Sequence, residues 1–421
     1  MRKNVVAAFA VGIVVFSSRA RAEDGSCSKI NRANVVRCAE AASLEVRAQR
    51  QEVDVAAARK TGASSILPAN PTLTVTGARR TAVNCASSAT NWYGTLSQEI
   101  EIAGQRGLRR EAADHEVVAQ RRRTVVTERD VAAEALIAYF DAVAAGEVAR
   151  LATRLEATGR AVAVATRARA ETGVASPLEA DIADASSLGL VRARLAAERA
   201  ADGARIELTS LLGRDPAAAI VEVEGELAPL PEVGGMAARV DEQPEVRALE
   251  EQARSLDAQA SAYRRARIPN ATFQFYVQND GFNERVYGGG LSLPIPLPFP
   301  LGRTNRGEIA EAEARSTRVV TEADLERRGI SRRVAIAARN FDSRRREVEA
   351  FTPERVARAD RTLADIATEI GGGRLAVRDV LLGQQALIEL LRGHIEARHA
   401  LCIASVELSR AVGMPLERGG Q

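Results

Sequence analysis

The chain has 421 residues, which is enough for two or three ordinary domains or for one elongated one. Lys and Arg number 58 and Asp and Glu 55, so the formal net charge is only +3 and no nucleic-acid partner is indicated. Three histidines and 4% aromatic residues argue against an enzyme with a deep aromatic core.

Residues 1–22 are predicted to be a removable signal peptide. Arg2 and Lys3 form a basic start, residues 5–16 an apolar core, and Ala20-Arg21-Ala22 a small-x-small cleavage pattern. The apolar core is too short to span a membrane, and an uncleaved anchor is the alternative. No later stretch has the roughly 18 consecutive apolar residues of a spanning helix. If the mature chain enters a membrane, it does so with strands.

Residues 23–215 are predicted to form a first structural repeat. A helix over residues 35–65 leads into a β-hairpin over residues 72–102, with a polar loop at residues 81–91. A proline-free helical stretch follows, long enough for a rod of about 100 Å at 1.5 Å per residue. It turns at Thr172-Gly173, and Ser176 and Pro177 are predicted to cap a new helix, with Glu179 and Asp181 in its first turn. This helix returns to Leu212, which completes a helical hairpin over residues 106–212.

Residues 216–243 are predicted to be a linker with a short strand at 221–224, and residues 244–421 to be a second repeat. This repeat has a helix at 244–267, a hairpin at 271–297 with its turn at 279–283, and a helical hairpin at 306–412. The first helix of this helical hairpin is interrupted once, at Pro353, and the tip of the hairpin lies at residues 371–373.

The two repeats are related by a constant offset. Gly173 and Gly373 stand 200 positions apart, as do Gly213 and Gly413 and as does the pair Arg106-Gly107 with Arg306-Gly307. Agreement among several spacings is the sign of an internal duplication.

The four predicted strands alternate between polar and apolar residues, so each has one wet and one apolar face. The wet face is expected to line a lumen and holds Thr95, Ser97, Glu99, Glu101, Thr272, Gln274 and Gln278. The other face is expected to meet lipid with an aromatic girdle and holds Trp92, Leu96, Phe273, Phe275, Tyr287, Leu291 and Leu293. A soluble four-stranded sheet with an aromatic core is the alternative.

Four strands cannot close a barrel by themselves, because about eight is the small limit. An open edge cannot face lipid, so several chains must pool their strands. Three chains would give twelve strands and twelve helical segments. The fold class predicted is therefore mainly α with a β-barrel contribution, built from a duplicated helix, β-hairpin and long helical hairpin.

Three stretches of the chain resemble a known protein family. Two of them lead from a strand into a helix, SQEIEIAGQRGLR (residues 97–109) and GGGLSLPIPLPFPLGRTNRGEIAEAEA (residues 288–314), and the third is LPANPTL (residues 67–73). The family that they resemble is that of the TolC-like outer-membrane efflux proteins. Within it they resemble the heavy-metal cation branch of cobalt–zinc–cadmium exporters. The resemblance implies a homotrimer with a 12-stranded barrel in outer-membrane lipid and a periplasmic helical tube. It implies a passive exit duct, coupled by a periplasmic adaptor (membrane fusion) protein to an inner-membrane RND-type pump.

The resemblance also implies that the helical tips dock to the adaptor. The family's tip positions fall on Thr172, Gly173, Ser176, Pro177, Gly373, Leu375 and Asp379. The family's aromatic residue three positions before the tip glycine is absent, since Ala170 and Ile370 stand there.

Four cysteines are present: Cys27, Cys38, Cys85 and Cys402. Many relatives carry a lipid on the cysteine after the signal peptide, but the leucine expected before Cys27 is missing. In an oxidising compartment Cys27 and Cys38 could instead form a disulfide, and the spacing decides neither. Cys402 lies on a helical pattern and is expected to be a small buried residue.

No catalytic, cofactor or metal site is predicted. His394 and His399 are five positions apart, which does not match the one-turn spacing of a zinc-binding helix pair. The function predicted is export of divalent heavy-metal cations. The alternatives are the same fold exporting drugs or a secreted polypeptide and, in another class, a periplasmic coiled-coil scaffold.

Overall fold

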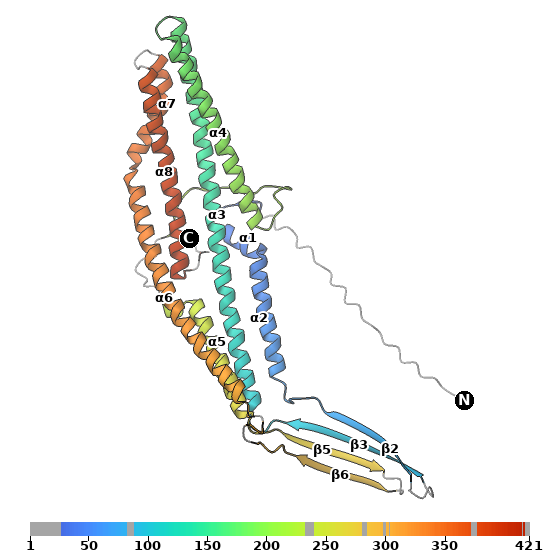
Figure 1. Cartoon of the computed structure of the whole chain (residues 1–421). Helices are drawn as coiled ribbons and strands as arrows, with labels where there is room; N and C mark the ends of the chain where they lie inside the picture. The colour runs from blue at the N-terminus through green and yellow to red at the C-terminus, as the bar shows by residue number, and fades with distance from the viewer. Residues whose placement is uncertain are drawn as a thin grey trace, which may run out of the picture.

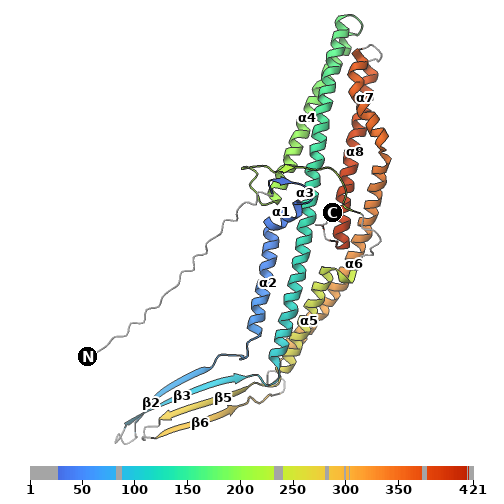
Figure 2. The same cartoon turned by 180° about the vertical axis from the view of Figure 1, so that it is seen from behind.

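The computed structural model describes residues 27–414, except 82–87, 232–239, 280–283, 298–299, 303 and 372–376, together with residue 416. Long helices run side by side over the length of the molecule, and a β-sheet extends from one end of them (Figures 1 and 2). The predicted signal peptide, residues 280–283 of the predicted turn and residues 372–373 of the predicted tip lie outside the described residues.

The sheet joins the two predicted hairpins into one antiparallel layer. Its strands are β2 (Thr72–Thr81), β3 (Ser88–Ile100), β5 (Ala271–Asn279) and β6 (Arg285–Ser292), in the order β2-β3-β5-β6. Within the sheet the two repeats meet at the pairing of β3 with β5, so β2 and β6 form the two edges of the sheet.

The largest differences from the predicted strands are at the start of β3 and the end of β6. β3 begins at Ser88 and not at Trp92, because its polar first residues continue the ladder with β2, down to Thr81 opposite Ser88. β6 ends at Ser292 and not at Leu297, because Pro294 and Pro296 carry no N–H to extend the ladder.

Near the sheet, four helices lie in the order α2, α3, α5 and α6. The helix predicted over residues 35–65 is two helices, α1 (Val35–Ala42) and α2 (Leu44–Ala63), because Ser43 leaves helical geometry and caps α2 by accepting from the Val46 N–H. α3 (Gln105–Glu171) is unbroken over 67 residues, and α5 (Pro244–Arg265) packs along it. α6 (Arg306–Ala350) lies on the outer side of α5.

Beyond the middle, α3 continues beside α4 (Pro177–Leu211), α7 (Pro353–Gly371) and α8 (Val377–Val412). α6 and α7 are the single interrupted helix that Pro353 predicts. Three turns share one geometry: Gly173, Gly213 and Gly413 all have positive φ, and the next residue donates back to a carbonyl five positions earlier.

The main core lies at the middle of the molecule, where α1 and the linker pack against α3. Tyr139 and Phe140 are its largest fully buried side chains. The short strands β1 (Lys29–Ile30) and β4 (Glu222–Val223) pair in parallel over it, and the Tyr139 hydroxyl donates to the Glu224 carbonyl. β4 confirms the short strand expected in the linker. A 3₁₀ turn, Val240–Glu242, leads into α5.

Cys27 and Cys38 form a disulfide with their Cα atoms 6.0 Å apart, which fastens the segment before β1 to α1. Since its sulfur is bonded to Cys38, Cys27 cannot also carry a lipid thioether. Cys402 is a fully buried free cysteine, as expected, and burial raises the pKa of its thiol to about 12.

No helix in the described part of the chain combines the length and the apolarity needed to cross a membrane.

Candidate functional site

The strand register separates the sheet into an apolar and a polar face. Leu73 lies opposite Leu96, Leu96 opposite Phe275, and Phe273 opposite Leu291. Because facing residues on neighbouring strands point to the same side, these rows form one apolar face. It includes Trp92, Leu96, Phe273, Phe275, Tyr287 and Leu291 of the predicted set.

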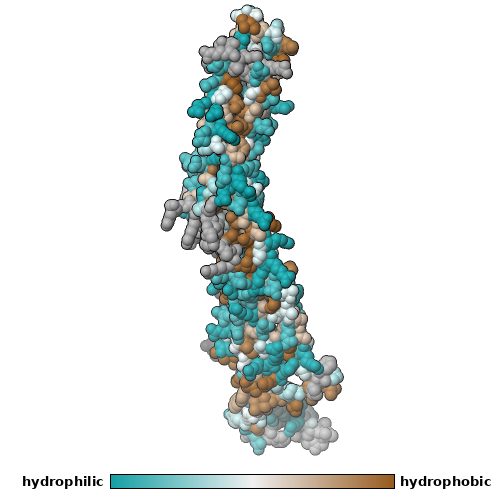
Figure 3. Space-filling view, turned by 90° about the vertical axis from the view of Figure 1, so that its left-hand side faces the viewer, coloured by the Kyte–Doolittle hydropathy of each residue, from teal (hydrophilic) through white to brown (hydrophobic). Residues whose placement is uncertain are grey.

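The apolar face is open to its surroundings. Phe275 is 53% exposed, Leu291 57% and Tyr287 62%, and no helix of the described chain covers them. Apolar side chains also gather near the sheet end in the space-filling view (Figure 3). A patch of this kind on a monomer marks a surface that meets a membrane or a partner.

The opposite face carries hydroxyl, amide and carboxylate groups. Thr72, Ser97 and Gln274 form one row across three strands, and Glu99 lies opposite Thr272. This face includes Thr95, Ser97, Glu99, Thr272, Gln274 and Gln278 of the predicted set. Two tyrosines, Tyr93 and Tyr276, also lie on it.

Two predicted face residues lie beyond the strands. Glu101 follows the end of β3, and its nearly buried carboxylate pairs with Arg109 in the first turns of α3. Leu293 follows the end of β6 and is 51% exposed. The predicted strands therefore ran too far toward the helices, by two residues at the end of β3 and by five at the end of β6.

A hydrogen-bonded chain ties the sheet to the helices at this junction. The Gln105 amide donates to Asn270 Oδ1 at 3.1 Å, and Asn270 Nδ2 donates to Glu99 Oε1 at 2.7 Å. Gln105 is 4% exposed, so its amide is satisfied inside the junction. No local sequence pattern points to Gln105 and Asn270, because their pairing joins residues 165 positions apart.

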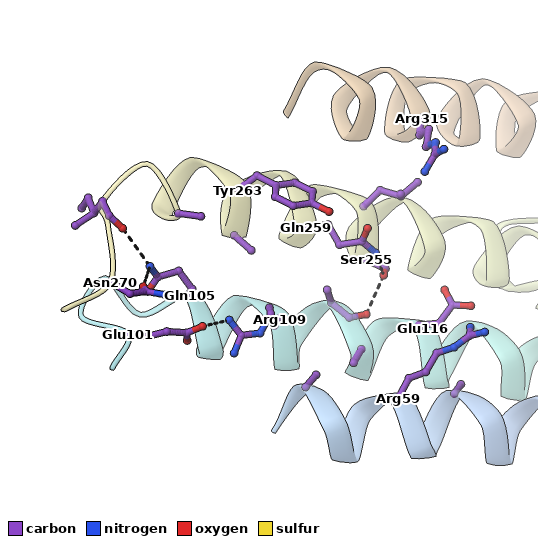
Figure 4. Close-up of a pocket in the computed structure, with 18 residues that line it drawn as sticks. Arg59, Glu101, Gln105, Arg109, Glu116, Ser255, Gln259, Tyr263, Asn270 and Arg315 are labelled. Carbon is purple, nitrogen blue, oxygen red and sulfur yellow. Dashed lines mark hydrogen bonds and ion pairs between the residues drawn. The ribbon is translucent and has the colours of Figure 1, made fainter. Parts of the chain in front are cut away.

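A cavity of about 750 Å³ opens beside the hydrogen bonds that join Gln105, Asn270 and Glu99 (Figure 4). All four helices near the sheet contribute to it, with Arg59 from α2, Glu116 from α3, Tyr263 from α5 and Arg315 from α6. Because Asn270 lines the cavity and also binds Glu99, the cavity adjoins the polar face of the sheet.

At the other end of the molecule, the first helical tip is capped as predicted. Ser176 accepts from the Glu179 N–H, the Glu179 carboxylate accepts from the Ser176 N–H, and Pro177 opens α4. Three apolar side chains here, Val174, Leu178 and Ile182, are 47–66% exposed. At the second tip Asp379 is exposed in the first turn of α8, while Gly373 and Leu375 lie outside the described residues.

The histidines are placed separately. His115 Nδ1 lies 2.6 Å from Glu251, and His399 Nε2 lies 2.6 Å from Asp141. His394 stands against the ring of Phe351, with centroids 5.7 Å apart, and burial lowers its pKa. In the parts of the chain that the structure describes, no group of three or more His, Cys, Asp and Glu side chains could hold a metal ion.

No family model matches the chain. It is 29% identical over 261 residues to the nickel-cobalt-cadmium resistance protein NccC of Alcaligenes xylosoxydans xylosoxydans, covering 59% of this chain and 57% of that protein. It is 28% identical over 257 residues to the nickel and cobalt resistance protein CnrC of Cupriavidus metallidurans, covering 60% of each. The chain thus spans less than two thirds of these relatives.

Among solved structures, the open state of the Neisseria gonorrhoeae MtrE outer-membrane channel superposes with a TM-score of 0.73. The match covers 93% of this chain and 90% of that channel at 18% identity. Nearly every element described above therefore has a counterpart in an outer-membrane channel, which establishes the fold.

Proposed function

We propose that this chain, whose fold is that of the TolC-like outer-membrane channels, is the outer-membrane component of a tripartite efflux system. It acts as a passive exit duct, with its sheet in the outer membrane and its helices in the periplasm. An inner-membrane RND-type pump drives the transport, and a periplasmic adaptor links the pump to the duct.

The observation that carries the proposal is the open sheet with one exposed apolar face. Its edge strands, β2 and β6, have no strand partner on their outer sides within the described chain. An unpaired strand edge is not tolerated in lipid. Pairing β2 of one copy with β6 of the next closes the sheet without changing either strand. Three copies give twelve strands, with the polar face turned inward around a lumen.

The helices support the same assembly. Near the sheet they form a row of four, with α2 and β2 on one side of the chain and α6 and β6 on the other. Three such rows make a tube of twelve helices below the barrel. Adaptor docking falls on the tips, where Val174, Leu178 and Ile182 of the first tip expose apolar surface that a partner would cover.

Divalent heavy-metal cations are the proposed cargo, because the relatives are named for resistance to nickel, cobalt and cadmium. Deleting the gene is expected to sensitise cells to divalent cobalt, zinc, cadmium or nickel, and the wild-type gene is expected to restore tolerance. Unchanged metal tolerance with raised sensitivity to dyes or detergents would reject this cargo in favour of organic compounds.

Two neighbouring residues give a matched test of the membrane assignment. Phe275 lies on the apolar face and Gln274 on the polar face of the same strand. An arginine facing lipid at mid-membrane costs about 2–4 kcal/mol, whereas one in a lumen faces water. Phe275→Arg is therefore expected to abolish rescue of the deletion and Gln274→Arg to retain it. Equal rescue by both, with the protein soluble in the periplasm as a monomer, would support a scaffold instead.

A further inference from the structure

Tyr276 is an aromatic residue on the polar face of the sheet, near its middle. It lies opposite Gly288 on β6 and opposite Thr95 on β3. A Cβ atom added at Gly288 would overlap the Tyr276 ring at Cζ and Cε1. The ring therefore lies across the backbone of β6, flat on the sheet, in the space that a side chain at position 288 would fill.

Gly288 begins a run of three glycines, and only this one is covered by a ring. A Cβ at Gly290, two positions along on the same face, would have nothing within 4 Å. One at Gly289, on the apolar face, would meet only the Gln274 carbonyl oxygen at an ordinary 3.5 Å. Glycine weakens a strand, so a glycine in its interior commonly marks a close approach by another group. At Gly288 that group is the Tyr276 ring.

We propose that Tyr276 and Gly288 together set the width of the channel at the middle of the sheet. Gly288 lets the Tyr276 ring lie against the wall, and any side chain there pushes the ring away from the wall. This inference rests on the proposed function, which places the polar face toward a lumen. In a closed assembly of three copies, three such rings stand at one level of the lumen.

The geometry gives the pair this role because the ring has one direction in which to move. The strands of the sheet are on one side of it, and Tyr276 is 38% exposed on the other. The three atoms nearest to a Cβ at Gly288 all belong to the far end of the Tyr276 side chain. A small residue at position 288 is therefore expected to rotate the ring toward the lumen and leave the sheet intact.

The experiment is single-channel conductance of the purified full chain in planar lipid bilayers. Gly288→Ala is expected to lower the conductance, and Gly290→Ala, on the same face of the same strand, to leave it unchanged. Tyr276→Ala is expected to raise it. The double variant Gly288→Ala/Tyr276→Ala is expected to lose the decrease and conduct like Tyr276→Ala, because there is no ring left to displace.

Thiol labelling tests the orientation independently. Cys402 is buried and Cys27 is bonded to Cys38, and Cys85, which lies outside the described residues, is replaced by serine in every protein tested. Tyr276→Cys is expected to react with a charged methanethiosulfonate and lose current, and Phe275→Cys, its neighbour on the apolar face, to be unaffected. If channels form and Tyr276→Cys reacts, but Gly288→Ala conducts like Gly290→Ala, the inference is wrong and the proposed function stands. If no variant or wild-type protein forms channels, the proposed function itself fails.

Discussion

The two halves of the molecule follow one plan but differ in how their longest helix is built. α3 in the first half is continuous over 67 residues. In the second half the equivalent rod is α6 and α7, which separate at Phe351 and Thr352 because Phe351 leaves helical geometry and Pro353 starts a new helix. The duplication has kept the glycine-ended turns in both halves and has not kept the continuity of the rod.

The packing around the two rods also differs: it is closer around the middle of α3 than around the break between α6 and α7. The middle of α3 is buried in the main core with Tyr139 and Phe140. The break between α6 and α7 instead borders two cavities of about 860 and 430 Å³, both of which touch Phe351, His394 and Arg398. The break between α6 and α7 thus lies beside open space, whereas α3 is continuous and closely packed around Tyr139 and Phe140.

The largest effect is expected on the free energy of unfolding, when a buried phenylalanine is removed from the core of each half. Phe140 is fully buried beside Tyr139, with ring centroids 5.3 Å apart, while Phe341 of α6 packs in a small cluster with Leu401 and Ala404. Phe140→Ala is expected to lower the free energy of unfolding by about 3–5 kcal/mol, and Phe341→Ala by less. Denaturation followed by circular dichroism at 222 nm measures both. Equal losses would show that the two halves are equally well packed.

The next largest effect on stability is expected at Gly213 and Gly413, the equivalent glycines that follow α4 and α8. Both have positive φ, where a side chain costs about 1–2 kcal/mol. A Cβ at Gly213 would come to 3.0 Å from the Ala42 Cβ, a tight contact, whereas one at Gly413 would overlap the Gln243 amide and displace it. That amide donates to the Val412 carbonyl at 2.6 Å and accepts from Arg129 at 3.0 Å. Gly413→Ala is therefore expected to destabilise the chain more than Gly213→Ala in the same measurement, and the reverse order would contradict this role of Gln243.

The cap of the first tip is expected to give a smaller effect. Ser176→Ala removes the acceptor for the Glu179 N–H and is expected to cost about 1 kcal/mol. Ser176→Asp keeps an acceptor at the cap and serves as the control. Because the change is local, hydrogen exchange of the first amides of α4 is the sensitive measurement. If both variants exchange alike, the cap contributes nothing to the order of the tip.

Much of this architecture follows from local sequence signals. The alternation of residues 92–100 and 271–278, the capping pattern at Ser176-Pro177 and the interruption at Pro353 each depend on neighbouring residues, and each is confirmed. The kink at Ser43, the ends of β3 and β6 and the disulfide were missed or left open. Ser43 is a residue type that caps helices, but it lies among good helix formers, so the sequence pattern did not separate a cap from a helical serine.

The junction could not be predicted because it is made of long-range pairs. Glu101 continues the alternation of β3 in sequence, yet it turns to Arg109 once the chain enters α3. Gln105 meets Asn270 only when the two repeats lie side by side. The pairing of β3 with β5, which brings the repeats together, is likewise invisible in any single stretch of sequence.

The smallest effect is expected from His394 of α8, at the break in the second half. Burial against Phe351, and then the charge of Arg398, lower its pKa from 6.5, while Glu147 acts in the opposite direction. Because the unfolded chain then binds more protons than the folded one, stability is expected to fall as the pH drops below about 6.5. His394→Phe keeps a ring against Phe351 and removes the titration. Denaturation midpoints of wild type and variant are expected to diverge increasingly as the pH falls below about 6.5. His115 and His399 are present in both proteins, so parallel pH profiles would mean that protonation of His394 does not act on the break.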